Sequence, residues 1–141
     1  MEDVSHSAKL KAEATYNAAS DHFDSAPLAF WERYGRRTVE RLSMPRAGHI
    51  LDVCCGAGAS ALPAARIVGP DGKVVAVDLA QGLLKLAKYK ALAADLRNVE
   101  FRRADMTALD YPDGHFDAVV CVFGIFSCQI WKSSLHALGD L

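Results

Sequence analysis

The stretch Ile50-Leu-Asp-Val-Cys-Cys-Gly-Ala-Gly58 decides the fold of this chain. Its apolar first half predicts a short buried strand. Gly56 and Gly58 then allow a sharp turn in which the backbone can approach a ligand more closely than a Cβ atom would permit. An Ala-rich segment with helical character follows. A strand, a glycine-rich turn and a helix in this order are typical of nucleotide-binding α/β domains.

Strand and helix patterns alternate through the rest of the chain. Apolar runs predict further strands over 73–78, 99–103 and 116–122, of which the first and last are apolar enough to be fully buried. Helical spacing predicts helices up to about residue 19, over 28–42, after the glycine turn and over 83–96. We therefore expect an α/β fold: a Rossmann-like parallel sheet sandwiched by helices and incomplete after strand four.

The composition excludes several classes of function. A length of 141 residues suits one domain. The 16 basic and 17 acidic side chains nearly balance, so the chain has no strong positive electrostatic field that would attract nucleic acid. The longest apolar run, 118–126, is too short to span a membrane, and the N-terminus lacks the pattern of a signal peptide. The four cysteines form no C-x-x-C pair, so we expect buried thiols and no metal site. These features favour a cytoplasmic location.

Three chemical features follow the ends of predicted strands, where open α/β sheets bind ligands. The first is the glycine turn with Asp52 before it. The second is Asp78, whose carboxylate can accept hydrogen bonds from two vicinal ribose hydroxyls. The third is Asp105, placed to receive the amino group of a purine. Each feature is weak alone, but their order and spacing together indicate a nucleoside-containing cofactor.

Four motifs in this order resemble those of class I S-adenosylmethionine (SAM) dependent methyltransferases, particularly the ubiquinone and menaquinone C-methyltransferases. They are Ile50 to Gly58, Val75-Ala-Val-Asp78, Ala104-Asp105 and Phe116-Asp-Ala-Val-Val120. The resemblance covers about residues 10–126. It implies SAM as the cofactor and methyl transfer to a small-molecule acceptor.

The resemblance also implies roles for individual residues along the cofactor. They are Asp52, Gly56, Gly58 and Phe123 at the methionine part, Asp78 at the ribose, and Leu79, Asp105 and Met106 at the adenine. Tyr16 and Phe23 resemble aromatic lid positions. No residue qualifies as a catalytic base from the sequence; His22, near the lid, is the best candidate, against the plainer interpretation of a surface histidine.

The resemblance divides the chain into a helical lid segment (1–45), a SAM-binding domain (46–126) and an atypical tail (127–141). Cys54 stands where the family usually has its first glycine. The tail does not resemble the family's continuation, so we expect a C-terminally truncated chain. We hypothesise that it is read in a shifted frame, because dropping one base from codons for Phe-Val-Pro-Asp-Met-Glu can yield residues 127–132. A genuine alternative ending with a short helix over 134–138 is the competing interpretation.

Two other functions remain open from the sequence. Residues 56–61 satisfy G-x-G-x-x-A with Asp78 at a suitable offset, which is typical of nicotinamide-binding domains. The chain can also be a non-catalytic methyltransferase fragment. If the sheet lacks the strands that normally follow strand four, this strand is an exposed apolar edge. We therefore expect the chain to self-associate.

Overall fold

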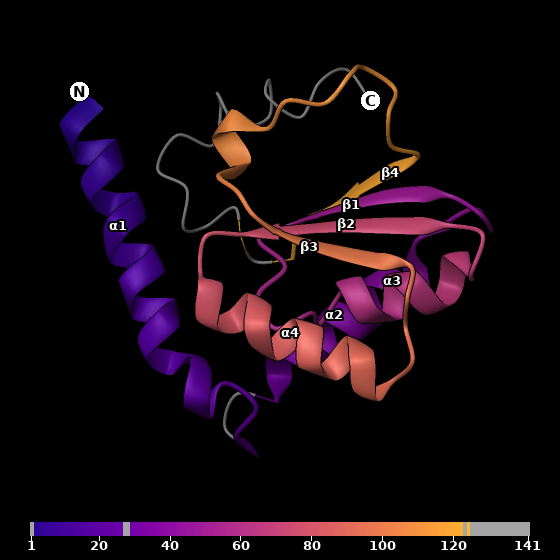
Figure 1. The fold of residues 1–141 in the computed structure, drawn as a ribbon, viewed down its shortest axis with the longest axis horizontal. Helices are drawn as coiled ribbons and strands as arrows, with labels where there is room; N and C mark the ends of the chain where they lie inside the picture. Colours follow the sequence, from indigo (N-terminus) through magenta and orange to yellow (C-terminus); the bar gives the residue numbers. More distant parts are fainter. Residues whose placement is uncertain (1, 27–28, 123, 125–141) are drawn as a thin grey trace.

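Four parallel strands form one sheet in the computed structural model, which describes residues 2–26, 29–122 and 124. The strands are β1 (His49–Val53), β2 (Lys73–Asp78), β3 (Val99–Arg103) and β4 (Ala118–Val120). Their order in the sheet is β3-β2-β1-β4 (Figure 1). The predicted parallel α/β sheet is confirmed. β4 is shorter than the predicted 116–122, so Cys121 follows the strand instead of lying in it.

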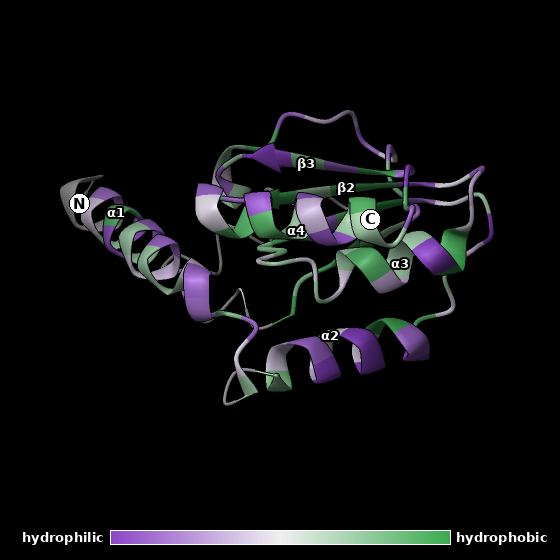
Figure 2. Cartoon of the chain, turned by 60° about the horizontal axis from the view of Figure 1, so that its bottom comes forward, coloured by the Kyte–Doolittle hydropathy of each residue, from purple (hydrophilic) through white to green (hydrophobic). Residues whose placement is uncertain are grey.

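Helices fill the connections that the sequence indicated. They are α1 (Glu2–Ala19), α2 (Phe30–Arg41), α3 (Ala61–Val68) and α4 (Gln81–Ala93), with short 3-10 turns η1 (Ser20–His22) and η3 (Met106–Ala108). α3 and α4 join successive parallel strands and lie on the same face of the sheet, as right-handed crossovers require (Figures 1 and 2). α2 packs against α3 farther from the sheet (Figure 2). None of the helices in the described residues has the length and apolarity needed to cross a bilayer.

The apolar core has two parts, one on each face of the sheet. On the helix-covered face, Ile50, Val74 and Ala76 pack against α3 and against Val39 of α2. On the other face, β1 and β2 pack against Met106 and side chains of the connection between β3 and β4. The chain must cross this second face to place β4 beside β1. In the part of the chain that the structure describes, this connection and not a long helix covers the second face.

β4 differs from β2 in its burial. The middle of β2 is fully buried, whereas Ala118 and Val119 of β4 are only half-buried. The prediction of full burial was therefore wrong for β4, because within the described residues this strand pairs with β1 alone. A reciprocal pair of hydrogen bonds joins the two strands at their amino ends. The His49 N–H donates to Oδ2 of Asp117 at 2.8 Å, and the Asp117 N–H donates to the His49 carbonyl at 2.7 Å.

Candidate cofactor site

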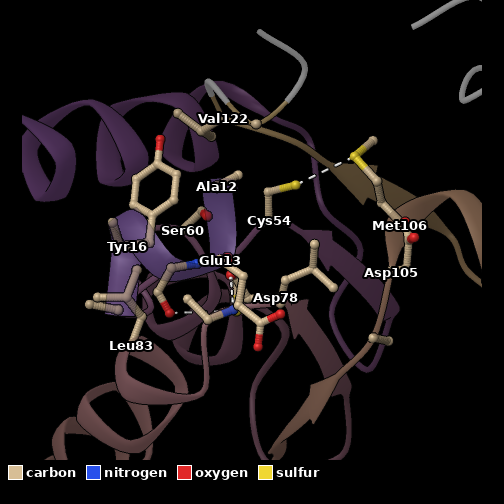
Figure 3. A pocket seen from close by; sticks show the side chains of 18 of the residues that line it. Ala12, Glu13, Tyr16, Cys54, Ser60, Asp78, Leu83, Asp105, Met106 and Val122 are labelled. Atoms are coloured by element: carbon tan, nitrogen blue, oxygen red, sulfur yellow. Dashed lines mark hydrogen bonds between the residues drawn. The ribbon is translucent and has the colours of Figure 1, made fainter. Parts of the chain in front are cut away.

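A cleft opens at the carboxyl ends of the strands. The chain builds the sheet in one direction from β1 to β3 and then returns to place β4 on the other side of β1, so a topological switch point lies between β1 and β4. The cleft lies over this region and is closed on one side by α1 (Figure 3). Its lining includes Tyr16, Cys54, Gly56, Asp78, Leu79, Asp105, Met106 and Val122.

The turn after β1 depends on left-handed backbone. Cys54 has φ of 57°, Gly56 of 52° and Gly58 of 88°. A Cβ on Gly58 would come within 3.1 Å of Leu62 in α3, so this glycine is needed for the helix to pack close to the turn. Cys54 adopts a backbone conformation that residues other than glycine rarely take. Gly56 lines the cleft, whereas Gly58 faces α3 and lies outside the lining.

Asp78 ties the glycine turn to the start of α4. Its Oδ2 accepts the N–H of Gly56 at 2.8 Å, and its Oδ1 accepts the N–H of Ala80 at 2.9 Å (Figure 3). Burial raises the pKa of Asp78, although these N–H groups oppose the shift. Each carboxylate oxygen can accept a further hydrogen bond. The side chain can therefore bind two hydroxyl groups while it still holds the turn.

Asp52 lies behind the wall of the cleft. Its side chain is fully buried, and its Oδ2 accepts a hydrogen bond from the Ser60 hydroxyl at 2.7 Å. Its Oδ1 has no hydrogen-bond partner within the described residues. Burial raises the pKa of Asp52 to about 7, so the carboxyl is substantially protonated near neutral pH. Ser60, which donates to Asp52, lines the cleft, whereas Asp52 itself does not. Direct contacts of Asp52 and Gly58 with a ligand stay predictions.

Asp105 is held from two directions. Its Oδ1 accepts hydrogen bonds from the backbone N–H of Thr107 at 2.9 Å and from the Thr107 hydroxyl at 2.8 Å. Its Oδ2 forms an ion pair with Lys9 of α1, with Nζ 2.7 Å away. Burial tends to raise the pKa of Asp105, but the hydrogen bonds from Lys9 and Thr107 together lower it. Asp105 is thus an anion held in place at the edge of the cleft.

Aromatic side chains from the N-terminal segment close the cleft. Tyr16 and Phe23 pack against Ala57, Ala80 and Leu83 beside the glycine turn. The ring of Phe23 stacks on Trp31 with centroids 6.2 Å apart. All three aromatic residues line the cleft. Tyr16 and Phe23 therefore lie at the cleft, and their role as a lid stays a prediction.

The remaining residues named from the sequence differ in whether they line the cleft. Leu79 and Met106 line the cleft as expected, His22 is exposed on η1 outside it, and Phe123 lies outside the described residues. The sequence interpretation missed several lining residues: Lys9, Glu13, Trp31, Cys54 and Thr107. Lys9, Glu13 and Tyr16 recur at helical spacing on one face of α1, which is a signal that could have found them.

The geometry fits SAM. An apolar wall and two carboxylates, those of Asp78 and Asp105, line the same cleft. The profile of the family described as "Methyltransferase domain" matches residues 50–140. The chain belongs to the SAM-dependent methyltransferases. The glycine spacing that left a nicotinamide function open thus occurs here within a methyltransferase domain.

Curated relatives support the assignment. The chain is 35% identical to ubiquinone/menaquinone biosynthesis C-methyltransferases of Ectopseudomonas oleovorans and Pseudomonas putida, over 134 residues. Each match covers 88% of this chain, but 76% of the first relative and 51% of the second. The chain therefore spans about half the length of several relatives that it matches.

Solved structures share the fold. A SAM-dependent methyltransferase from Aquifex aeolicus superposes with a TM-score of 0.73 at 22% identity, covering 86% of this chain and 64% of that one. A Haemonchus contortus phosphoethanolamine N-methyltransferase in complex with S-adenosylhomocysteine superposes with a TM-score of 0.68 at 14% identity, covering 83% of this chain and 26% of that one. At these identities the likeness concerns the fold alone.

Proposed function

We propose that this chain binds SAM in the cleft and serves methyl transfer to a small organic acceptor. The observation that carries this proposal is the position of Asp78, which holds the glycine turn through Gly56 and keeps acceptor capacity toward the cleft. In this arrangement Asp78 binds the ribose hydroxyls, and Asp105 with Met106 and Leu79 surrounds the adenine. The names of the curated relatives point to C-methylation of a quinone ring or its precursor.

The residues of the cleft position the donor and exclude water. When bound, SAM supplies a methyl group already activated by its sulfonium, so alignment is the protein's main task. Tyr16, Phe23 and Trp31 shield this region from solvent. A carbon acceptor must also lose a proton. Among the described residues no histidine lines the cleft, so we assign no base there.

Two further inferences concern the cellular location of the protein and its partners. We infer a cytoplasmic location, the kind of compartment in which free thiols such as those of Cys54, Cys55 and Cys121 persist. We also infer that nucleic acid is not a partner, since the basic and acidic side chains nearly balance.

Calorimetry with S-adenosylhomocysteine and separately with NADH tests the cofactor. We expect binding of the first and no response to the second. NADH binding without S-adenosylhomocysteine binding would contradict the proposal. A subsequent assay of methyl transfer from SAM to a quinone-ring precursor separates an active enzyme from a fragment that only binds the cofactor.

A further inference from the structure

Three sulfur atoms meet at the wall of the cleft. Sγ of Cys54 lies 3.5 Å from Sδ of Met106 (Figure 3). The Cys54 thiol also shares a hydrogen bond with the thiol of Cys121, just after β4. A Cβ atom placed on Gly124 would lie 2.7 Å from the Cys54 sulfur and 3.0 Å from the Cys121 sulfur, so both sulfurs lie close to Gly124 and to each other.

The three residues come from different parts of the chain, which explains why cysteine spacing did not reveal the cluster. Cys54 follows β1, Met106 begins η3 and Cys121 follows β4. Cys54 and Met106 line the cleft, and Cys121 is half-buried behind them. The cluster is therefore reachable from solvent through the cleft. Cys54 contributes its sulfur from a left-handed backbone position at which a glycine would be more usual.

The donor set selects a particular class of ion. Two thiols and a thioether are soft ligands, which favour Cu(I) over Mg²⁺ or Ca²⁺. Zn²⁺ usually takes four ligands, and the described residues contain no group of three or more His, Cys, Asp or Glu side chains suited to a metal. Sulfur ligands about 2.3 Å from a shared ion lie roughly 3.8–4.0 Å apart. The 3.5 Å between Cys54 and Met106 is close to this spacing.

We propose that Cys54, Cys121 and Met106 form a binding site for a soft monovalent metal ion of the Cu(I) class. On binding, both S–H bonds break, two metal–thiolate bonds form and two protons leave to solvent. The Met106 thioether adds as a neutral ligand, and no electron is transferred. An ion here would also obstruct the cleft, a consequence that rests on the proposed SAM function.

Competition for Cu(I) against a chromogenic Cu(I) chelator, with the reduced full chain under anaerobic conditions, tests the site. We expect one ion per chain and a thiolate-to-copper absorption band in the near ultraviolet. Cys54→Gly and Cys121→Ala should each weaken the affinity by more than the roughly 10–100-fold that loss of an outer-shell partner costs. Met106→Leu should weaken it less, because a thioether is the weaker ligand.

Matched variants keep the result interpretable. Cys128→Ser removes the fourth thiol of the chain, and Met44→Leu replaces a methionine in the opposite half of the core; both should bind like the original chain. Cys54→Gly places glycine at a left-handed position, so misfolding does not explain a loss. Unchanged affinity in Cys54→Gly and Cys121→Ala would overturn the site. So would oxidation, seen as two thiols lost from the chain with no ion retained.

A second arm tests the obstruction. One equivalent of Cu(I) should weaken S-adenosylhomocysteine binding at least tenfold in the original chain and leave it unchanged in Cys121→Ala. Tight Cu(I) binding with undiminished S-adenosylhomocysteine affinity would overturn the obstruction. If the metal-free chain does not bind S-adenosylhomocysteine at all, the proposed function fails while the metal result stands.

Discussion

The side-chain oxygen of Asn17 in α1 accepts a hydrogen bond from the N–H of Gly82, 2.8 Å away, in the first turn of α4. No side chain at Ala80 caps this helix, so the cap comes from a different helix. A Cβ on Gly82 would lie 2.7 Å from Oγ of Ser20, which shows how closely η1, directly after α1, approaches α4. The N-terminal segment is therefore joined to the first turn of α4, close to Asp78.

Loss of this cap should loosen the lid. We expect Asn17→Ala to lower the free energy of unfolding by about 1 kcal/mol, the usual effect of removing a helix cap. Hydrogen exchange of the α1 amides should also become faster. Asn17→Asp is the control, because it keeps the acceptor and adds a negative charge favoured at a helix N-terminus. Equal exchange in α1 of all three proteins would contradict the coupling.

Replacement of Asp78 should weaken cofactor binding. We expect Asp78→Ala to reduce the binding free energy of S-adenosylhomocysteine by about 1.5–3 kcal/mol, since charge-assisted hydrogen bonds are lost. Asp78→Asn should have a smaller effect. Calorimetry on folded protein measures both, and Asp110→Ala, at an exposed site, is the control. Unchanged affinity in both Asp78 variants would remove the ribose assignment.

The buried Asp52 should make stability depend on pH. Because its folded-state pKa is about 7 and its ordinary value is 3.8, the folded state retains the proton longer. Its contribution to stability is thus greatest below about pH 4 and is lost as pH rises toward 7. We expect Asp52→Asn to remove this loss, with a difference on the order of 4 kcal/mol above pH 7.

Urea unfolding at pH 5 and pH 8 measures this effect. The advantage of Asp52→Asn over the original chain should grow between the two pH values. Asp110→Asn provides the control at a solvent-exposed carboxylate and should not change the profile. Parallel pH profiles for the original chain and Asp52→Asn would refute the raised pKa.

Gly35 allows α2 to approach the turn before α3. A Cβ at Gly35 would lie 2.7 Å from the carbonyl carbon and oxygen of Ala59. Replacing glycine by alanine in an exposed helix usually stabilises the helix by about 1 kcal/mol. Overpacking against backbone costs about 1–3 kcal/mol, so we expect Gly35→Ala to lower the melting temperature. Thr38→Ala, exposed in the same helix, should not lower it; equal melting temperatures would contradict the close contact.

The half-buried β4 should favour self-association. Within the described residues its outer side pairs with no strand, and a row of unpaired backbone groups beside apolar side chains invites another chain. We expect sedimentation velocity to show larger species as protein concentration rises. A single monomeric species at all concentrations, melting cooperatively above roughly 50 °C, would show that this sheet is self-sufficient.

The sequence predicts the bounds of β2 well, because this apolar run lies between Gly72 and the acid Asp78, whereas β4 is shorter than predicted. Asp78 illustrates this, since its place after a buried strand is sufficient to put it in the cleft. Asp52 illustrates the limit. It shares a face of β1 with Ile50, under α3, and the two-residue period of a strand could have indicated this. The Lys9–Asp105 ion pair could not be predicted, because it depends on how α1 crosses a site far away in the sequence.

The reciprocal hydrogen bonds between His49 and Asp117 have a mechanical consequence. They fasten β1 to β4 at the end of the sheet farthest from the cleft. At the other end, only three residues of β4 pair with β1 before the chain turns away. The register of β4 against β1 is therefore fixed from the amino ends of the strands. A slip of one residue would break both hydrogen bonds and turn the side chains of β4 to the opposite faces of the sheet.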